Sequence, residues 1–172
     1  MKFKAAILNQ LKKDLIVDEI KIINRLKKGQ ALVKVNYSGV CGSQIGEING
    51  IKGKDRFLPH LLGHEGVGEI LEVSKEIKRF TPGQKVILHW KPSQGIQSDT
   101  PQYLWNKKIV NAGWVTTFNE LAIVSENRIS KIDDNSSFLD NVLFGCAILT
   151  GFGVIKKDAK IKEGDTVLVF GA

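Results

Sequence analysis

The strongest constraint on the fold is the run of short apolar segments that fills the first 125 residues. Residues 32–37 alternate between apolar and polar side chains, as a half-buried strand does. Valine, isoleucine and leucine also gather, with turn-forming residues between the segments, in residues 3–8, 15–22, 63–73, 85–88 and 117–124. Short strands with frequent turns predict a β-barrel or a β-sandwich.

A polar stretch interrupts this pattern at residues 91–115. It has little periodicity but carries three aromatic residues, Tyr103, Trp105 and Trp114. Loops of this length are uncommon unless they are functional or packed on themselves. We therefore expect a surface excursion that is held by its own aromatic side chains.

The pattern changes to helix after residue 135. Ser136 or Ser137 can cap a helix, and Asp140 lies in its first turn. The apolar residues that follow, 142–155, are interrupted by three glycines, which predicts a broken helix or close packing.

Residues 166–170 are wholly apolar and lead into Gly171, as in the first strand of a Rossmann nucleotide-binding domain. We expect residues 1–135 to form one domain. We expect residues 136–172 to form a helical connection and the first strand of a nucleotide-binding domain that is truncated here.

Bulk composition excludes several classes of protein. The formal charge is +7, but the lysines are scattered and no nucleic-acid-binding motif accompanies them, so we expect no nucleic-acid partner. No apolar run approaches the ~20 residues of a membrane helix. The basic and apolar N-terminus is too short for a secretory signal. We expect a cytoplasmic protein that does not span a membrane.

The chain has two cysteines, Cys41 and Cys146, fewer than a secreted disulfide scaffold of this size normally carries. The separations of these cysteines from His64 are 64 − 41 = 23 and 146 − 64 = 82 residues, unlike the close cysteine pairs of zinc fingers. Spacing alone favours two buried thiols, with a single disulfide between them as an alternative. Glycines flank both Cys41 and the pair His64-Glu65, and this local context strengthens the case for a metal site while the other two alternatives stay open.

Four segments, taken together, resemble the zinc-dependent medium-chain alcohol dehydrogenases. They are residues 39–43 (GVCGS), 59–68 (PHLLGHEGVG), 145–153 (GCAILTGFG) and 162–172 (KEGDTVLVFGA). They occur in the family's order and extend over nearly the whole chain. The resemblance implies a mainly β fold with some α: a GroES-like, partly open β-barrel, followed by a helical segment and the start of a Rossmann domain.

The resemblance also implies one catalytic zinc ion on Cys41, His64 and Cys146. Three protein ligands leave a fourth position open, as a catalytic site requires. Zinc lowers the pKa of a bound alcohol or polarises a carbonyl, and hydride passes to or from NAD or NADP.

Further roles follow from the same resemblance. Ser43 corresponds to the hydroxyl that takes the alcohol proton, and Glu65 to a carboxylate behind the metal that either joins it or only supports its ligands. Thr150 corresponds to a residue that touches the nicotinamide, and Gly171 to the entry into the cofactor domain. Trp90 falls where the family lines its substrate pocket, although a packing role is open.

The sequence departs from the family at several positions. Gln44 stands where an aspartate is usual, Gly46 where many members have a proton-relay histidine, and Ser74 where glycine or alanine is usual. The four closely spaced cysteines that bind a structural zinc in many relatives are missing, so we expect a single zinc. His60 and His89 match no ligand of the family.

The resemblance therefore implies an NAD(P) oxidoreductase that acts on an alcohol, polyol or sugar hydroxyl, or on the matching carbonyl. We expect a small-molecule substrate, a homo-oligomer, and no turnover by residues 1–172 alone. Two alternatives remain: a zinc-free enone or quinone reductase of the same superfamily, and a non-catalytic GroES-like binding module. Bound metal would argue against both.

Overall fold

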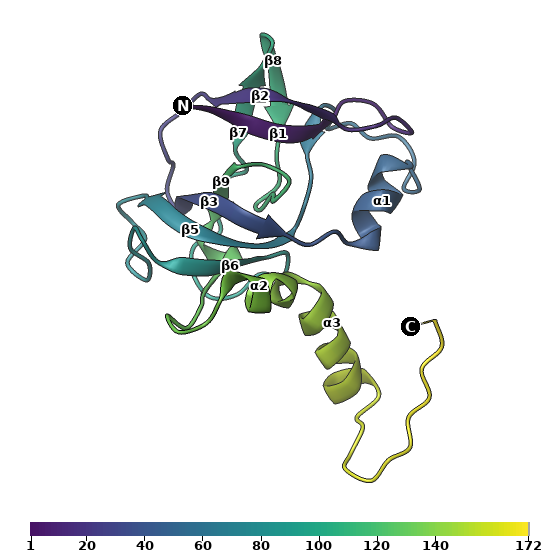
Figure 1. Cartoon of the computed structure of the whole chain (residues 1–172). Coiled ribbons are helices and arrows are strands. Elements are labelled where there is room, and N and C mark those ends of the chain that lie inside the picture. Colours follow the sequence, from purple (N-terminus) through teal and green to yellow (C-terminus); the bar gives the residue numbers. More distant parts are fainter. Residues whose placement is uncertain (172) are drawn as a thin grey trace.

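The computed structural model describes residues 1–171 and confirms a mainly β fold built from two sheets (Figure 1). One sheet closes into a small barrel in the order β1 (Lys2–Leu8), β2 (Ile16–Ile22), β7 (Gln102–Trp105), β8 (Lys108–Asn111) and β4 (His60–Leu61). The other sheet is open, in the order β10 (Ile129–Lys131), β6 (Lys85–His89), β5 (Glu65–Val73), β3 (Gln30–Ser38) and β9 (Leu121–Ser125). The expected β-barrel is thus present, beside an open sheet.

Alternation of apolar residues explains how the barrel closes. In β1, Phe3, Ala5 and Ile7 point inward, whereas Lys2 and Lys4 are exposed and Ala6 is half-buried. A cluster of buried apolar side chains fills this barrel, drawn from β1, β2, β4, β7, β8 and neighbouring strands. A second buried cluster lies against the open sheet and includes Val33, Ile70 and Leu88. These two clusters are the hydrophobic cores of the two sheets.

The stretch 91–115 is not the surface excursion that its polarity predicts. Its middle forms the antiparallel hairpin β7–β8, and β7 pairs with β2 of the barrel. Tyr103 is fully buried, its hydroxyl accepts a hydrogen bond from the Ile123 amide at 2.9 Å, and Trp105 is only 8% exposed. The prediction was wrong because four-residue strands are too short to show a clear period, while the barrel supplies their partners.

The helical segment agrees better with its prediction. Ser137 caps α2 (Phe138–Asn141) by accepting a hydrogen bond from the Asp140 amide at 3.1 Å. The chain continues as a 3₁₀ turn (Val142–Gly145), α3 (Ala147–Gly153) and a π-helical turn (Val154–Asp158). This is the broken helix that the glycines predict. Elsewhere, α1 (Gly42–Ile48) follows β3, and a 3₁₀ turn (Glu126–Arg128) joins β9 to β10.

The strand expected at residues 166–170 does not form. This stretch has no regular structure and runs beyond α3 away from both sheets (Figure 1). Phe170 is 86% exposed and Leu168 is 76% exposed. A strand depends on hydrogen bonds to a neighbouring strand, and no segment within residues 1–171 pairs with this one.

Within the same residues, no single helix is long and apolar enough to cross a membrane. The two helical stretches Phe138–Gly145 and Ala147–Asp158 reach the required length and composition only together, across a 56° bend.

Candidate metal centre

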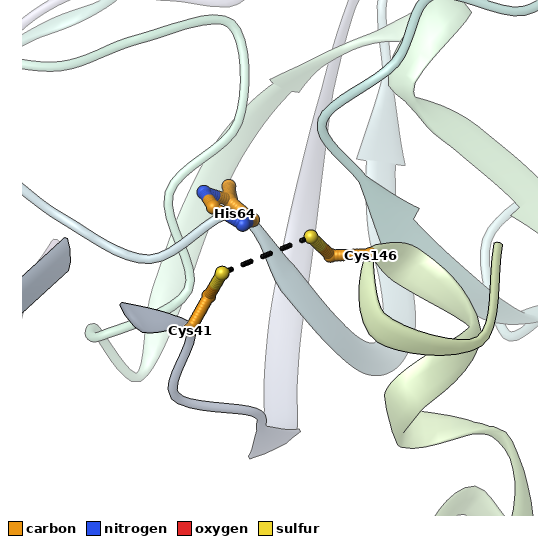
Figure 2. Close-up of side chains that lie close together, drawn as sticks. All are labelled: Cys41, His64 and Cys146. Carbon is orange, nitrogen blue, oxygen red and sulfur yellow. Dashed lines mark hydrogen bonds between the residues drawn. The ribbon is translucent and has the colours of Figure 1, made fainter. Parts of the chain in front are cut away.

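Three residues that are distant in the sequence meet at one end of the open sheet. Cys41 directly precedes α1, His64 directly precedes β5, and Cys146 directly precedes α3. Their side chains point toward one another from these three element starts (Figure 2). The two sulfur atoms and one histidine ring nitrogen all lie within 4.8 Å of one another. The fold therefore assembles the ligand set that the sequence resemblance implies.

Glycines make this approach of three chain segments feasible. Gly63 adopts a φ of +88°, a left-handed conformation that side chains rarely take, and so turns the chain into His64. A Cβ atom at Gly145 would collide with the carbonyl of Leu88 and the Cβ of Glu65. Only glycine at position 145 lets the segment that carries Cys146 lie this close to β5 and β6.

The two cysteines are not joined as a disulfide. Their sulfur atoms are 4.0 Å apart, about twice the S–S bond length of ~2.05 Å. A separation of this size suits two thiolates that share one tetrahedral ion with Zn–S bonds of ~2.3 Å.

His64 shows the clearest sign of a missing partner. Its Nδ1 lies 2.5 Å from the amide nitrogen of Gln44, whereas its Nε2 is buried without any hydrogen-bond partner in the described part of the chain. A buried polar nitrogen without a partner is costly. A metal ion between the ring and the two sulfurs would satisfy it, so the donor set fits zinc.

The surroundings favour the protonation states that metal binding needs at two of the ligands. Burial lowers the pKa of His64, which keeps the imidazole neutral. Hydrogen bonding from Ser43 lowers the pKa of the Cys41 thiol and favours its thiolate. Burial raises the pKa of the Cys146 thiol, with the nearby Cys41 acting in the same direction. A cation would offset the cost of placing two thiolates together.

Glu65 is 2% exposed and supports the Cys146 segment. Its Oε2 accepts hydrogen bonds from the backbone amides of Cys146 at 3.0 Å and Ala147 at 3.1 Å. These contacts join β5 to the start of α3 and fix the position of Cys146, the third candidate ligand.

The other residues singled out from the sequence are placed as follows. Ser43 is exposed in the first turn of α1, beside Cys41. Trp90 and Thr150 line one cavity of about 230 Å³, and the Thr150 hydroxyl lies 4.0 Å from the Cys146 sulfur. Gly171 is exposed on the C-terminal stretch, with open space beside its Cα, and no described contact brings it to this site.

Sequence reasoning missed the contacts of Gln44 and a second polar cluster. His60 donates from Nδ1 to the Leu61 carbonyl at 2.9 Å, and its Nε2 lies 2.9 Å from Asp55 and 3.9 Å from Glu47. Both ring nitrogens already have partners, so this cluster is a hydrogen-bonded network centred on His60. The two carboxylates lie in segments without periodic signal, and only folding brings them to His60.

A comparison with known families identifies the class. The model of the alcohol dehydrogenase GroES-like domain matches residues 27–134, more than half of the chain, and the chain therefore belongs to this family. Its resemblance to zinc-dependent medium-chain alcohol dehydrogenases is thereby confirmed.

Individual relatives agree with this class. The chain is 29% identical to S-(hydroxymethyl)glutathione dehydrogenase of Escherichia coli O1:K1 / APEC, over 99% of the chain and 53% of the relative. It is also 29% identical to the enzyme of the same name from Photobacterium damsela subsp. piscicida, over 84% of the chain and 46% of the relative. The chain thus spans about half the length of these curated relatives.

Solved structures share the fold at lower identity. An alcohol dehydrogenase zinc-binding domain protein from Burkholderia ambifaria superposes with a TM-score of 0.84 at 18% identity, over 95% of this chain and 50% of that one. Benzyl alcohol dehydrogenase from Acinetobacter calcoaceticus gives a TM-score of 0.77 at 21% identity, over 94% of this chain and 49% of that one.

Proposed function

We propose that this chain is the metal-binding catalytic domain of a zinc-dependent NAD(P) oxidoreductase that interconverts an alcohol and its aldehyde or ketone. The observation that carries the proposal is the convergence of Cys41, His64 and Cys146 within 4.8 Å, with His64 Nε2 buried and without a partner. Curated relatives that are named dehydrogenases support the reaction class.

The residues present define what this domain contributes. Cys41, His64 and Cys146 would hold one zinc ion, which when bound polarises the oxygen of an alcohol or carbonyl. To Ser43, which is exposed beside Cys41, we assign the acceptance of the proton of an alcohol that reaches the site. Glu65 keeps Cys146 in position through the two amide hydrogen bonds.

In the cavity that Trp90 and Thr150 share, we assign Trp90 to the substrate pocket and Thr150 to contact with the nicotinamide, and we assign Gly171 to the entry of the nucleotide-binding domain. Within residues 1–171 the stretch 166–170 pairs with no strand, so the first strand that we assign to a nucleotide-binding domain is not formed there. We therefore expect residues 1–172 alone to be inactive, with 1–135 and 136–172 belonging to the two domains predicted above. A small-molecule alcohol, a homo-oligomer and a cytoplasmic location complete the proposal.

Metal analysis tests the centre directly. Protein purified without chelators should hold about one zinc per chain, and Cys41→Ser or His64→Asn should lose it. His60→Asn is the matched control, because both ring nitrogens of His60 have their own partners away from the proposed centre. A stoichiometry near two, or zinc retained in Cys41→Ser, would contradict the assignment. A folded protein without zinc would favour the zinc-free reductase or the binding module.

A further inference from the structure

Gln44 contacts two of the elements of the metal centre at once. Its side chain is 3% exposed and lies in the first turn of α1. Its Oε1 accepts a hydrogen bond from the backbone amide of Cys41 at 3.2 Å, and its Nε2 lies 2.5 Å from His64 Nδ1. One amide thus connects the first and second proposed ligands.

The two ends of an amide are not equivalent. Its oxygen only accepts hydrogen bonds and its nitrogen only donates. The Cys41 amide can only donate, so it requires the oxygen of Gln44, and the opposite orientation would place two donors together. The nitrogen of Gln44 therefore faces His64 Nδ1, which must accept.

This arrangement determines where the imidazole proton lies. When Nδ1 accepts, the single ring proton of a neutral His64 resides on Nε2. Nε2 is the nitrogen that is buried without a partner. A ring nitrogen of His64 lies within 4.8 Å of both sulfurs, and Gln44 already occupies Nδ1, which leaves Nε2 to face a metal ion. A metal ligand instead needs a lone pair on that nitrogen and a proton on the other one.

We infer that Gln44 holds His64 in the tautomer that cannot bind metal, so that loading the centre requires the proton to move to Nδ1 and the Gln44 amide to turn. Turning the amide removes the acceptor of the Cys41 backbone. Gln44 is thus a positioning residue that weakens and controls metal uptake. The inference rests on the proposed zinc centre.

Glutamate at position 44 resolves the conflict, because both carboxylate oxygens accept. It can hold the Cys41 amide and a protonated Nδ1 together and leave Nε2 free. Partners of metal-bound histidines change metal affinity by roughly 10–100-fold. We therefore expect Gln44→Glu to bind zinc about 10-fold more tightly than the unaltered protein.

Two further variants separate this effect from charge and from folding. Ile45→Glu adds the same charge one residue along α1 at a side chain that is 54% exposed, and should change zinc affinity much less. Gln44→Leu removes both contacts without adding charge. Gln44→Leu should free His64 from the Nε2-protonated tautomer and leave zinc affinity no lower than in the unaltered protein. A purely structural role for Gln44 predicts instead that zinc affinity falls.

The experiment combines zinc affinity, from competition with a chelator, with ¹⁵N NMR of the His64 ring in zinc-free protein. Spectra are recorded at about pH 8, above the ordinary histidine pKa of about 6.5. We expect the proton on Nε2 in the unaltered protein and on Nδ1 in Gln44→Glu. A proton on Nδ1 in the unaltered protein, or equal gains in affinity for Gln44→Glu and Ile45→Glu, would overturn the inference. Absence of zinc binding in every variant would instead overturn the proposed centre, while the Nε2 proton would still support the tautomer assignment.

Discussion

Replacing Glu65 with glutamine tests how the third ligand is held in place. The Glu65 carboxylate is 2% exposed and accepts the amides of Cys146 and Ala147 at one oxygen. Glutamine keeps an acceptor of the same size and shape but removes the charge. Both hydrogen bonds can persist, and both should weaken.

The magnitude follows from the two bonds. A hydrogen bond to a charged group contributes about 1.5–3 kcal/mol, against about 0.5–1.5 kcal/mol for a neutral pair. A loss of about 1 kcal/mol for each bond gives about 2 kcal/mol for the attachment of the Cys146 segment to β5. That free energy corresponds to about a 30-fold change in an equilibrium constant.

Amide hydrogen exchange measures this attachment locally. In Glu65→Gln, exchange at residues 146 and 147 should accelerate by up to about 30-fold, and zinc should bind less tightly because Cys146 is less well fixed. Glu126→Gln is a matched control: Glu126 is also buried, at 3% exposed, and accepts the Ile96 amide at 2.7 Å, but it does not contact the Cys146 segment. Unchanged exchange at residues 146 and 147, or an equal acceleration there in Glu126→Gln, would refute this reasoning.

Three further predictions concern acid sensitivity, proton transfer and association. Burial lowers the pKa of His89 below its ordinary 6.5, so the unfolded chain binds more protons than the folded chain. The free energy of unfolding should therefore fall as the pH drops through about 6.5. Urea denaturation at pH 7.5 and 5 should show a smaller fall for His89→Gln than for the unaltered protein. In the full-length enzyme, Ser43→Ala should slow alcohol oxidation by about 100-fold or more, and unchanged turnover would mean that the proton leaves through water. Phe152 and Phe170 are 58% and 86% exposed, so the chain should self-associate, and their joint replacement by glutamate should yield monomers in light scattering; a monomeric unaltered chain would contradict this.

The sequence by itself determined the features that depend on local pattern. Alternation in residues 32–37 predicted β3, and Ser137 predicted the start of α2, because side-chain period and capping act over a few residues. The motifs around Cys41, His64 and Cys146 also gave the proposed ligand set, through resemblance to a family. Spacing alone would have left buried thiols or a disulfide as alternatives.

Tertiary structure decided the features that depend on partners distant in the sequence. The hairpin β7–β8 forms because β2 pairs with it, and residues 166–170 remain unpaired because no described strand lies beside them. Glu65 supports a segment 81 residues away, and Gln44 meets a ring 20 residues away. Hydrogen bonds of this kind have direction and need exact placement of both partners, which residue spacing does not encode.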